Sequence, residues 1–174
     1  MKYIMKAGVL YQENRVAARI KSSLASPAKR VLSAEGHLLL QTDICNMEVP
    51  SDRQGDVRFR TYTMTAGQEE PLAIAKPDYA EGDDPMAAGW PFCRMPRVDR
   101  AQVQIGGSPY CLTMQNSQNY LLTESPQKVA VQILHRGLVG GWDIEVDEDF
   151  SPELICGIFI FCRYIEQENE FLIV

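Results

Sequence analysis

The stretch SPELICGIFIFCRYIEQE, residues 151–168, carries apolar side chains on every side of whatever regular structure it forms. Ser151 suits the N-cap of a helix, Pro152 suits the first helical position, and Glu153 complements the positive helix N-terminus. At about 100° per residue, the apolar side chains that follow are spread around the whole circumference and leave no polar stripe. The pattern therefore predicts a helix over 152–167 that is covered by protein on all sides.

Two alternatives compete with a buried helix in this stretch. A buried strand is one, because Ile-Phe-Ile-Phe at 158–161 is also good strand sequence and the acidic end 166–170 opposes the helix dipole. A membrane span is the other. The run Leu154–Ile165 would cover only about 18 Å as a helix, whereas a bilayer core is about 30 Å thick, and Arg163 interrupts it. We therefore expect a chain that is not transmembrane.

The rest of the sequence consists mostly of short segments that are typical of strands, separated by turn residues. The clearest is VRFRTYTM at 57–64, which is rich in β-branched and aromatic residues. The other expected strands are Lys2–Val9, His37–Ile44, Leu72–Lys76, Ala101–Ile105, Tyr110–Gln115, Tyr120–Thr123, Lys128–Leu134 and Trp142–Val146. Gly106–Pro109 and Gln115–Asn119 are typical of hairpin connections, so the succession predicts a meander. Gln12–Leu24 fits a helix or a strand, and its alanine and charged content slightly favours the helix.

The helix without a polar stripe and the succession of strands together predict one fold. A sheet closed around the helix would bury every face of the helix and would also remove exposed strand edges. We therefore predict a mainly β fold, a closed antiparallel β-barrel around a buried hydrophobic C-terminal α-helix, with residues 1–174 as a single domain. A length of 174 residues with 45% apolar and 23% charged residues is consistent with one globular domain.

Charge and cysteine content narrow the classes of partner. A formal net charge of −6 argues against a nucleic-acid partner, which would require concentrated lysine and arginine. The N-terminal segment has too little uninterrupted apolar length for a secretory signal, since Lys6 divides it, and we expect a cytoplasmic protein. Five cysteines without a CxxC pair suggest neither a disulfide framework nor a zinc site, and we interpret them as buried reduced thiols.

In the order of its features the chain resembles a known family. The stretch VGGWDIEVDEDFSPELICGIFIFCRYIEQE, residues 139–168, places a Gly-Trp-led strand, an acidic turn and an apolar helix in succession, and SAEGHLLLQTDI at 33–44 looks like an early element of the same family. The pattern resembles the tubby C-terminal-like superfamily, which includes the plant LURP-one-related proteins and the phospholipid scramblases. The resemblance implies a closed antiparallel barrel, twelve-stranded in tubby, around a hydrophobic helix near the C-terminus.

The resemblance also implies a class of function. Members of the superfamily are mostly non-catalytic; tubby binds phosphoinositide headgroups and scramblases act on phospholipid membranes. This chain differs from tubby in its acidic balance and shows no dense cluster of lysine and arginine. It also lacks the proline-rich N-terminal stretch and the cysteine cluster of scramblases, so we do not expect it to scramble phospholipids.

Residues that could support catalysis or bind a cofactor are scarce. His37 and His135 are the only histidines, and we interpret both as surface or turn residues. No serine lies in a GxSxG motif. Gly140-Gly141 lacks the spacing of a phosphate-binding loop and is interpreted as a tight turn, with Trp142 packing into the barrel. We predict that the protein is not an enzyme and that it has no cofactor.

An acidic run precedes the helix, where scramblases carry a calcium-associated acidic segment. Its spacing does not match an EF-hand loop, and its first residues alternate with apolar ones. We interpret the run as the solvated face of a strand followed by a turn, rather than as a metal site. Its members are Asp143, Glu145, Asp147, Glu148 and Asp149.

A small set of basic residues carries the functional hypothesis. Arg58 and Arg60 share one strand face by period-two geometry, with Lys76 and Arg97 as candidate neighbours. We expect a cytoplasmic non-catalytic binding or scaffold protein that contacts anionic phospholipid headgroups weakly through these four residues.

The alternative to headgroup binding is a module that binds a small molecule or a protein partner at the barrel rim and the loop 81–91. Trp90 and Phe92 would then belong to an exposed apolar patch, although both could instead be buried as a plug of the barrel. An uncharacterised enzyme is the third choice.

Overall fold

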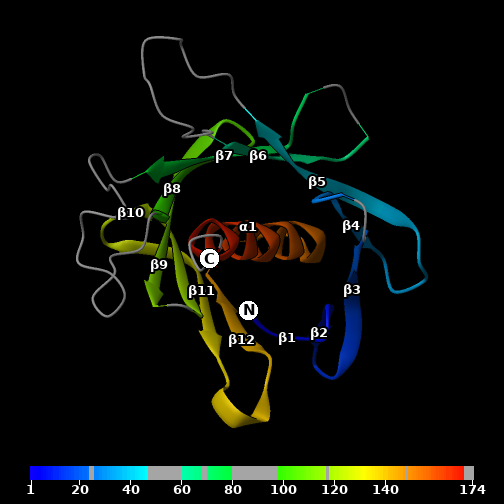
Figure 1. Cartoon of the computed structure of the whole chain (residues 1–174). Helices are drawn as coiled ribbons and strands as arrows, with labels where there is room; N and C mark the ends of the chain where they lie inside the picture. Colours follow the sequence, from blue (N-terminus) through cyan, green and yellow to red (C-terminus); the bar gives the residue numbers. More distant parts are fainter. Residues whose placement is uncertain are drawn as a thin grey trace, which may run out of the picture.

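The backbone of this chain, seen in a computed structural model, closes into a β-barrel with one helix inside it (Figure 1). The structure describes residues 1–23, 26–46, 60–67, 70–79, 98–116, 118–147 and 149–170. The strands are β1 (Lys2–Lys6), β2 (Val9–Gln12), β3 (Arg15–Ser22), β4 (Lys29–Leu32), β5 (Leu38–Asn46), β6 (Arg60–Thr65), β7 (Ala73–Tyr79), β8 (Val98–Ile105), β9 (Ser108–Asn116), β10 (Asn119–Ser125), β11 (Lys128–His135) and β12 (Trp142–Val146). A 3-10 turn, η1 (Gly137–Val139), joins β11 to β12, and the helix α1 spans Pro152–Glu170.

Each strand pairs antiparallel with the strands that precede and follow it in the sequence. The ring is completed by β1 and β12, where Tyr3 lies opposite Ile144 and Met5 lies opposite Trp142. Because the ring is closed, each strand has a hydrogen-bonded neighbour on both sides. The predicted meander and the predicted closed antiparallel barrel are both confirmed.

The helix α1 occupies the inside of this ring, as predicted from its lack of a polar stripe (Figure 1). Its buried side chains point in all directions around the axis and include Leu154, Ile155, Cys156, Ile158, Phe159, Ile160, Phe161, Cys162, Tyr164 and Ile165. The helix begins at Pro152 as predicted and continues to Glu170. The alternative of a buried strand in this stretch is wrong.

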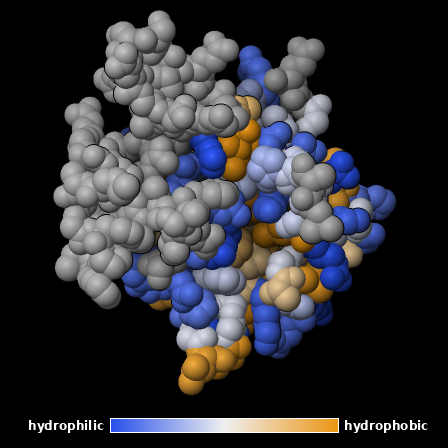
Figure 2. Space-filling view, in the orientation of Figure 1, coloured by the Kyte–Doolittle hydropathy of each residue, from blue (hydrophilic) through white to orange (hydrophobic). Residues whose placement is uncertain are grey.

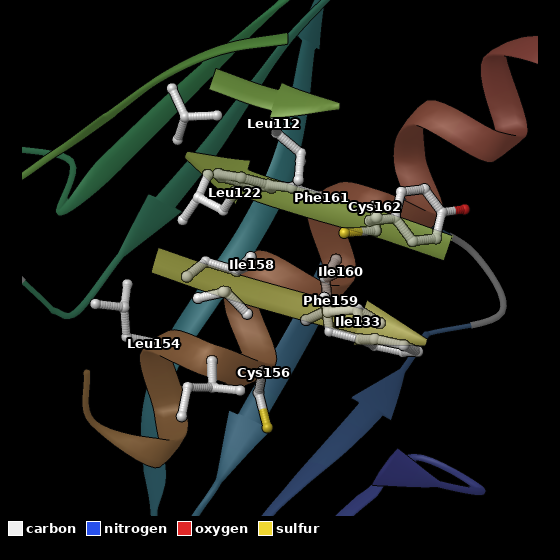
Figure 3. Close-up of a cluster of buried hydrophobic side chains, with 14 of the residues drawn as sticks. Leu112, Leu122, Ile133, Leu154, Cys156, Ile158, Phe159, Ile160, Phe161 and Cys162 are labelled. Atoms are coloured by element: carbon white, nitrogen blue, oxygen red, sulfur yellow. The ribbon is translucent and has the colours of Figure 1, made fainter. Parts of the chain in front are cut away.

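Aromatic and aliphatic side chains fill the space between helix and wall. The ring centroids of Phe159 and Trp142 lie 4.9 Å apart in an edge-on arrangement, and those of Phe161 and Tyr62 lie 6.0 Å apart. Figure 3 shows the helix side chains among Leu112, Leu122 and Ile133, which come from β9, β10 and β11. The interior is therefore a packed core built from helix and strands together.

The slight preference for a helix over Gln12–Leu24 is wrong, and the strand alternative is confirmed. Residues Arg15–Ser22 form β3, which pairs with β2 on one side and with β4 on the other. A helix here would leave the facing backbone groups of β2 and β4 without partners, which costs more than the weak helix propensity of the segment can offset. Strand pairing therefore overrides the local preference.

The expected strand Lys2–Val9 is divided in the structure. A tight turn separates β1 from β2, because Ala7 and Gly8 both adopt positive φ. A Cβ atom at Gly8 would lie 3.2 Å from the carbonyl oxygen of Ile20, so only glycine fits there easily. β4 was not among the expected strands, and the strand expected over 57–64 is described from Arg60 onward.

The cysteines divide into buried and accessible thiols. Cys156 and Cys162 on α1 are fully buried. Burial raises the pKa of the Cys156 thiol to about 12, and it also raises the pKa of the Cys162 thiol. Cys45 is exposed and Cys111 is partly exposed, so the interpretation of all five as buried thiols is wrong for these two. Cys93 lies outside the described residues.

Replacement of Phe159 by aspartate tests the threaded helix. Phe159 is 6% exposed, so an unpaired carboxylate there would cost about 3–5 kcal/mol of the free energy of unfolding. The matched control is Leu138→Asp, at a side chain that is 109% exposed, where the same change should leave stability within about 0.5 kcal/mol. Equal thermal stability of the two variants would show that Phe159 is not inside the barrel.

Replacement of Gly157 by alanine tests the contact between α1 and β6. A Cβ atom at Gly157 would lie 2.2 Å from Cε of Met64, a side chain with 0% exposure. The clash is with the thioether end of a flexible side chain that can shift within the core, so overpacking should outweigh the better helix propensity of alanine only slightly and lower the stability by about 1 kcal/mol. The loss should shrink in the double variant Gly157→Ala with Met64→Leu. A stabilising Gly157→Ala substitution would contradict the helix position.

Candidate functional site

Of the predicted headgroup residues, the structure describes Arg60 and Lys76 and places them on opposite sides of the wall. Arg60 lies two residues from the buried Tyr62 on the same strand and therefore shares its inner side of the wall. Lys76 is exposed and adjoins Ala75, which is buried and pairs with Tyr62. Arg60 and Lys76 therefore face opposite sides of the sheet. The other predicted site residues, Arg58, Arg97, Trp90 and Phe92, lie outside the described residues, as does the loop 81–91.

Arg60 instead belongs to a polar cluster around the C-terminal part of α1. Its Nη1 lies 3.3 Å from Oε1 of Glu168, a carboxylate that is only 3% exposed. The hydroxyl of Tyr62 donates to the same oxygen at 3.3 Å. A buried carboxylate without such partners would carry a large desolvation cost, so Arg60 and Tyr62 make the burial of Glu168 tolerable.

Two further side chains attach this part of α1 to the wall. The amide of Asn169 accepts from the backbone N–H of Val98 at 3.1 Å and donates to the carbonyl of the same residue at 2.9 Å. The hydroxyl of Tyr164 donates to the carbonyl of Pro27 at 2.8 Å and lies 2.9 Å from Oγ1 of Thr42. Burial raises the pKa of Tyr164 to about 12, so this hydroxyl keeps its proton at neutral pH.

The polar cluster is internally satisfied in the part of the chain that the structure describes. The hydroxyl of Tyr120 donates to Glu166 at 3.4 Å, and the same carboxylate is paired with Arg163. Across the described residues, every buried side-chain nitrogen or oxygen has a hydrogen-bond partner. We therefore interpret the cluster as the device that fixes α1 in the barrel, with no buried polar atom left over to receive a ligand.

A second group of charges lies on the outer wall and is the candidate functional site. Lys6, Arg19, Lys21 and Arg30 are all exposed and form what we call the basic face. Lys6 and Arg19 flank Val9 across two strand pairings, and Lys21 lies directly opposite Arg30. Strands β1, β3 and β4 thus hold four cations on one side of the barrel.

The basic face is not neutralised by acidic neighbours within the described residues. None of the four side chains of the basic face forms an ion pair there. The residue directly opposite Arg30 on β5 is the uncharged Gln41, and the acidic Asp43 is the next residue of β5 on the outer side of the wall. Like charges directly opposite each other on a sheet cost up to about 1 kcal/mol. The Lys21–Arg30 pair thus destabilises the fold and has no acidic partner among the described residues, which is a reason to look for an anionic partner outside the chain.

The sequence alone did not reveal the basic face, because residues 12–24 fitted both a helix and a strand and slightly favoured the helix. As a strand, the fragment RVAARIKSS places Arg19 and Lys21 on one face by period-two alternation. Arg15 is excluded, because a register shift next to Ala17 rotates it off that face. The strand alternative for this segment was therefore the signal that could have revealed the site.

The histidines and the acidic run show ordinary surface roles. His37 is exposed, and Nδ1 of His135 accepts from the backbone N–H of Gly137 at 3.1 Å. Asp143 and Glu145 are exposed on β12 and pair with Arg136 and Lys2, which confirms the solvated strand face. Glu148 lies outside the described residues, and the described part of the chain contains no group of three or more potential metal ligands.

The predicted tight turn before β12 is confirmed. Gly140 and Gly141 both adopt positive φ, and Trp142 packs against the core through the edge of Phe159. The indole N–H of Trp142 donates to the carbonyl of Gln118 at 3.1 Å. The glycine pair therefore serves to turn the chain from η1 into β12.

The outer wall also carries an open hollow of about 510 Å³ beside the basic face. Ile4, Tyr11 and Leu134 contribute its apolar lining, and Glu13 and Asp143 contribute acidic groups. The ion pair of Lys2 with Glu145, at 2.7 Å, lines both this hollow and a smaller one of about 320 Å³. The wall formed by β1, β2, β11 and β12 thus offers a concave surface.

Comparison with known proteins gives limited information. No protein-family model matches the chain. No curated protein sequence matches it. Among solved structures, it is similar to the X-ray structure of a protein from Arabidopsis thaliana, with 12% sequence identity, 94% of this chain and 91% of that chain covered, and a TM-score of 0.39. The description of the fold therefore rests on the strand pairing and on the position of α1.

Among the residues that the structure describes, no helix is both long enough and apolar enough to cross a bilayer.

Replacement of Arg60 by glutamine separates a structural from a binding role. Loss of the guanidinium should destabilise the protein by about 1–3 kcal/mol, because the buried Glu168 loses its charged partner. Lys76→Gln is the matched control, because it removes one exposed positive charge and should change stability by less than about 0.5 kcal/mol. Urea unfolding measures both variants, and indistinguishable midpoints would contradict the structural role of Arg60.

Proposed function

We propose that this chain is a tubby-like, non-catalytic cytoplasmic binding protein that contacts anionic phospholipid surfaces weakly and reversibly. The contact runs through the basic face, in place of the four basic residues expected from the sequence. The observation that carries the proposal is the exposed, directly opposed cation pair of Lys21 and Arg30, extended by Arg19 and Lys6. The threaded helix and the resemblance of residues 139–168 support the tubby-like type.

The filled interior directs binding to the outside of the barrel. The ring of Tyr62 on β6 packs against two rings of α1, with centroids 5.2 Å from that of Tyr164 and 6.0 Å from that of Phe161. A ligand inside the barrel would have to displace part of the helix that completes the core. Among the described residues, the exposed cations that form no ion pair lie on the outer wall.

The expected affinity is low. Each lysine or arginine near an anionic membrane contributes about 1 kcal/mol, so four give about 4 kcal/mol, which corresponds to a millimolar dissociation constant. A net charge of −6 opposes the approach of the whole molecule. The attachment should therefore be salt-sensitive, since the Debye length falls from about 10 Å at 0.1 M salt to about 3 Å at 1 M.

Liposome flotation with the double variant Lys21→Glu and Arg30→Glu tests the proposal. The parent chain should float with vesicles that contain phosphatidylserine or phosphoinositide at low salt, and only weakly with neutral phosphatidylcholine vesicles. The double variant should lose at least about tenfold in partitioning into anionic vesicles, because two contributing charges are reversed.

The matched control for this experiment is a single charge reversal, Lys76→Glu. It is compared with the single variant Lys21→Glu, which changes the charge by the same amount. Lys76 is exposed on β7, away from the basic face, and should be nearly neutral for vesicle binding. Equal partitioning of the parent into neutral and anionic vesicles at low salt, or a larger effect of Lys76→Glu than of Lys21→Glu, would contradict the basic face as the contact surface.

The hollow on the outer wall favours a second candidate function. A small molecule or an extended segment of a protein partner could occupy the space between Ile4, Tyr11 and Leu134. In that case Leu134→Glu should abolish binding of a partner that is recovered with the purified protein, whereas Lys21→Glu should not. The two variants therefore separate partner binding from lipid contact.

A further inference from the structure

The connection between β11 and β12 presents two aliphatic side chains to solvent. Leu138 is 109% exposed and Val139 is 63% exposed, and we call this pair the apolar tip. Figure 2 shows hydrophobic side chains that project at the lower edge of the molecule, where Figure 1 shows the connection that contains η1. These two side chains do not contribute to the core, and adjacent exposed aliphatic side chains of this kind are typical of an interaction site.

The base of the apolar tip is tightly held. The backbone N–H of Arg136 donates to the carbonyl of Gly141 at 3.0 Å, and that of Gly140 donates to the carbonyl of Gly137 at 3.1 Å. Gly141 adopts φ +88°, and a Cβ atom there would lie 2.6 Å from the carbonyl oxygen of Met5. Because this approach requires glycine, the turn is fastened to β1 and holds its two apolar side chains outward.

The charges around the apolar tip fit an anionic surface. Lys6 belongs to the basic face and also borders the tip, since its Cβ lies 3.4 Å from the position of a Cβ atom at Gly141. The acidic neighbour Asp143 lies 3.3 Å from the guanidinium of Arg136 and is compensated by it. An uncompensated lysine therefore lies between the apolar tip and the rest of the basic face.

The apolar tip and the basic face lie at the same end of the barrel. In a ring in which all neighbours are antiparallel, the odd-numbered strands run in one direction. Lys6 is the last residue of β1, Lys21 lies near the end of β3, and η1 follows the end of β11. A flat surface that approaches this end meets both features. A protein partner would need a pocket shaped for a convex tip, whereas the bilayer interface deforms around it.

We propose that the apolar tip inserts into the headgroup and acyl boundary of a phospholipid bilayer, next to the contacts of the basic face. The inference rests on the proposed function for the kind of surface, and it adds an apolar component of binding that does not depend on salt. It also fixes the orientation of the molecule, with the end of the barrel that carries η1 toward the membrane.

The double variant Leu138→Gln and Val139→Gln of the full chain tests the insertion. Partitioning into mixed phosphatidylcholine and phosphatidylserine vesicles should fall by at least about tenfold, and a reduction should persist at about 1 M salt, where charge contacts are screened. The control is a second exposed leucine that lies away from both surfaces. Leu72 is 36% exposed and directly precedes β7, whose start lies at the opposite end of the barrel from η1 and which holds no residue of the basic face, so the control Leu72→Gln should not change partitioning. Leu38 would be a poorer control, because it lies opposite Leu32, the partner of Arg19.

A fluorescence reporter gives a second, independent readout. The emission of a Leu138→Trp variant should shift to the blue when vesicles are added, and brominated lipid should quench it, whereas a Leu72→Trp variant should show neither change. Unchanged partitioning of the glutamine variant together with unshifted emission of Leu138→Trp would overturn the insertion.

The outcomes also distinguish this inference from the proposed function. If the reversal of Lys21 and Arg30 leaves binding intact while the glutamine variant loses it, the basic face is wrong and the insertion stands. If only the charge reversal matters, the insertion is wrong and the basic face stands.

Discussion

The absence of a polar stripe on α1 is the constraint on which the rest of the structure depends. A helix with apolar side chains on all sides cannot lie on the surface of a sheet, because one of its faces would remain in water. A ring of strands removes that face from water and, at the same time, pairs every strand edge. The barrel and the helix are therefore mutually required: the ring has no core without α1, and α1 has no cover without the ring.

Most of this architecture could be predicted from the sequence, because its strongest signals are local. The helix start at Pro152, the β-branched strand segments and the glycine-rich turns each follow from a few adjacent residues. The preference for a helix around Arg15–Ser22 was wrong for the opposite reason, since only pairing with β2 and β4 determines that this segment is a strand. Local propensity carries no information about a partner that is distant in the sequence.

The candidate site was less predictable than the fold. Arg60 was expected outside the barrel, but its position depends on Glu168, a residue that follows it by more than half of the chain. Lys21 and Arg30 become neighbours only through the pairing of β3 with β4. The apolar tip was not predicted because its sequence, Gly-Leu-Val, is ordinary, and only the tertiary structure shows that the described residues leave Leu138 and Val139 exposed.

The two surfaces proposed for binding lie on the outside of a barrel whose inside is committed to packing. This separation means that the residues of the basic face and of the apolar tip can change with little cost to the core. Residues such as Glu168 and Asn169 have the reverse character, because their partners on β6 and β8 hold the helix in place. Function and stability are thus assigned to different sides of the same wall.

The order of the elements along the chain has a consequence for how the molecule comes into being. All twelve strands in the described residues leave the ribosome before α1, so the ring has nothing to condense around while they are being made. At about 5–20 residues per second, the stretch from β1 to β12 takes on the order of ten seconds to synthesise, and during that time β1 lacks its partner on one side. Folding of this barrel is therefore a late event, set by the arrival of its last element, and a nascent chain that stops before α1 would expose the strand edges and apolar faces from which aggregation starts.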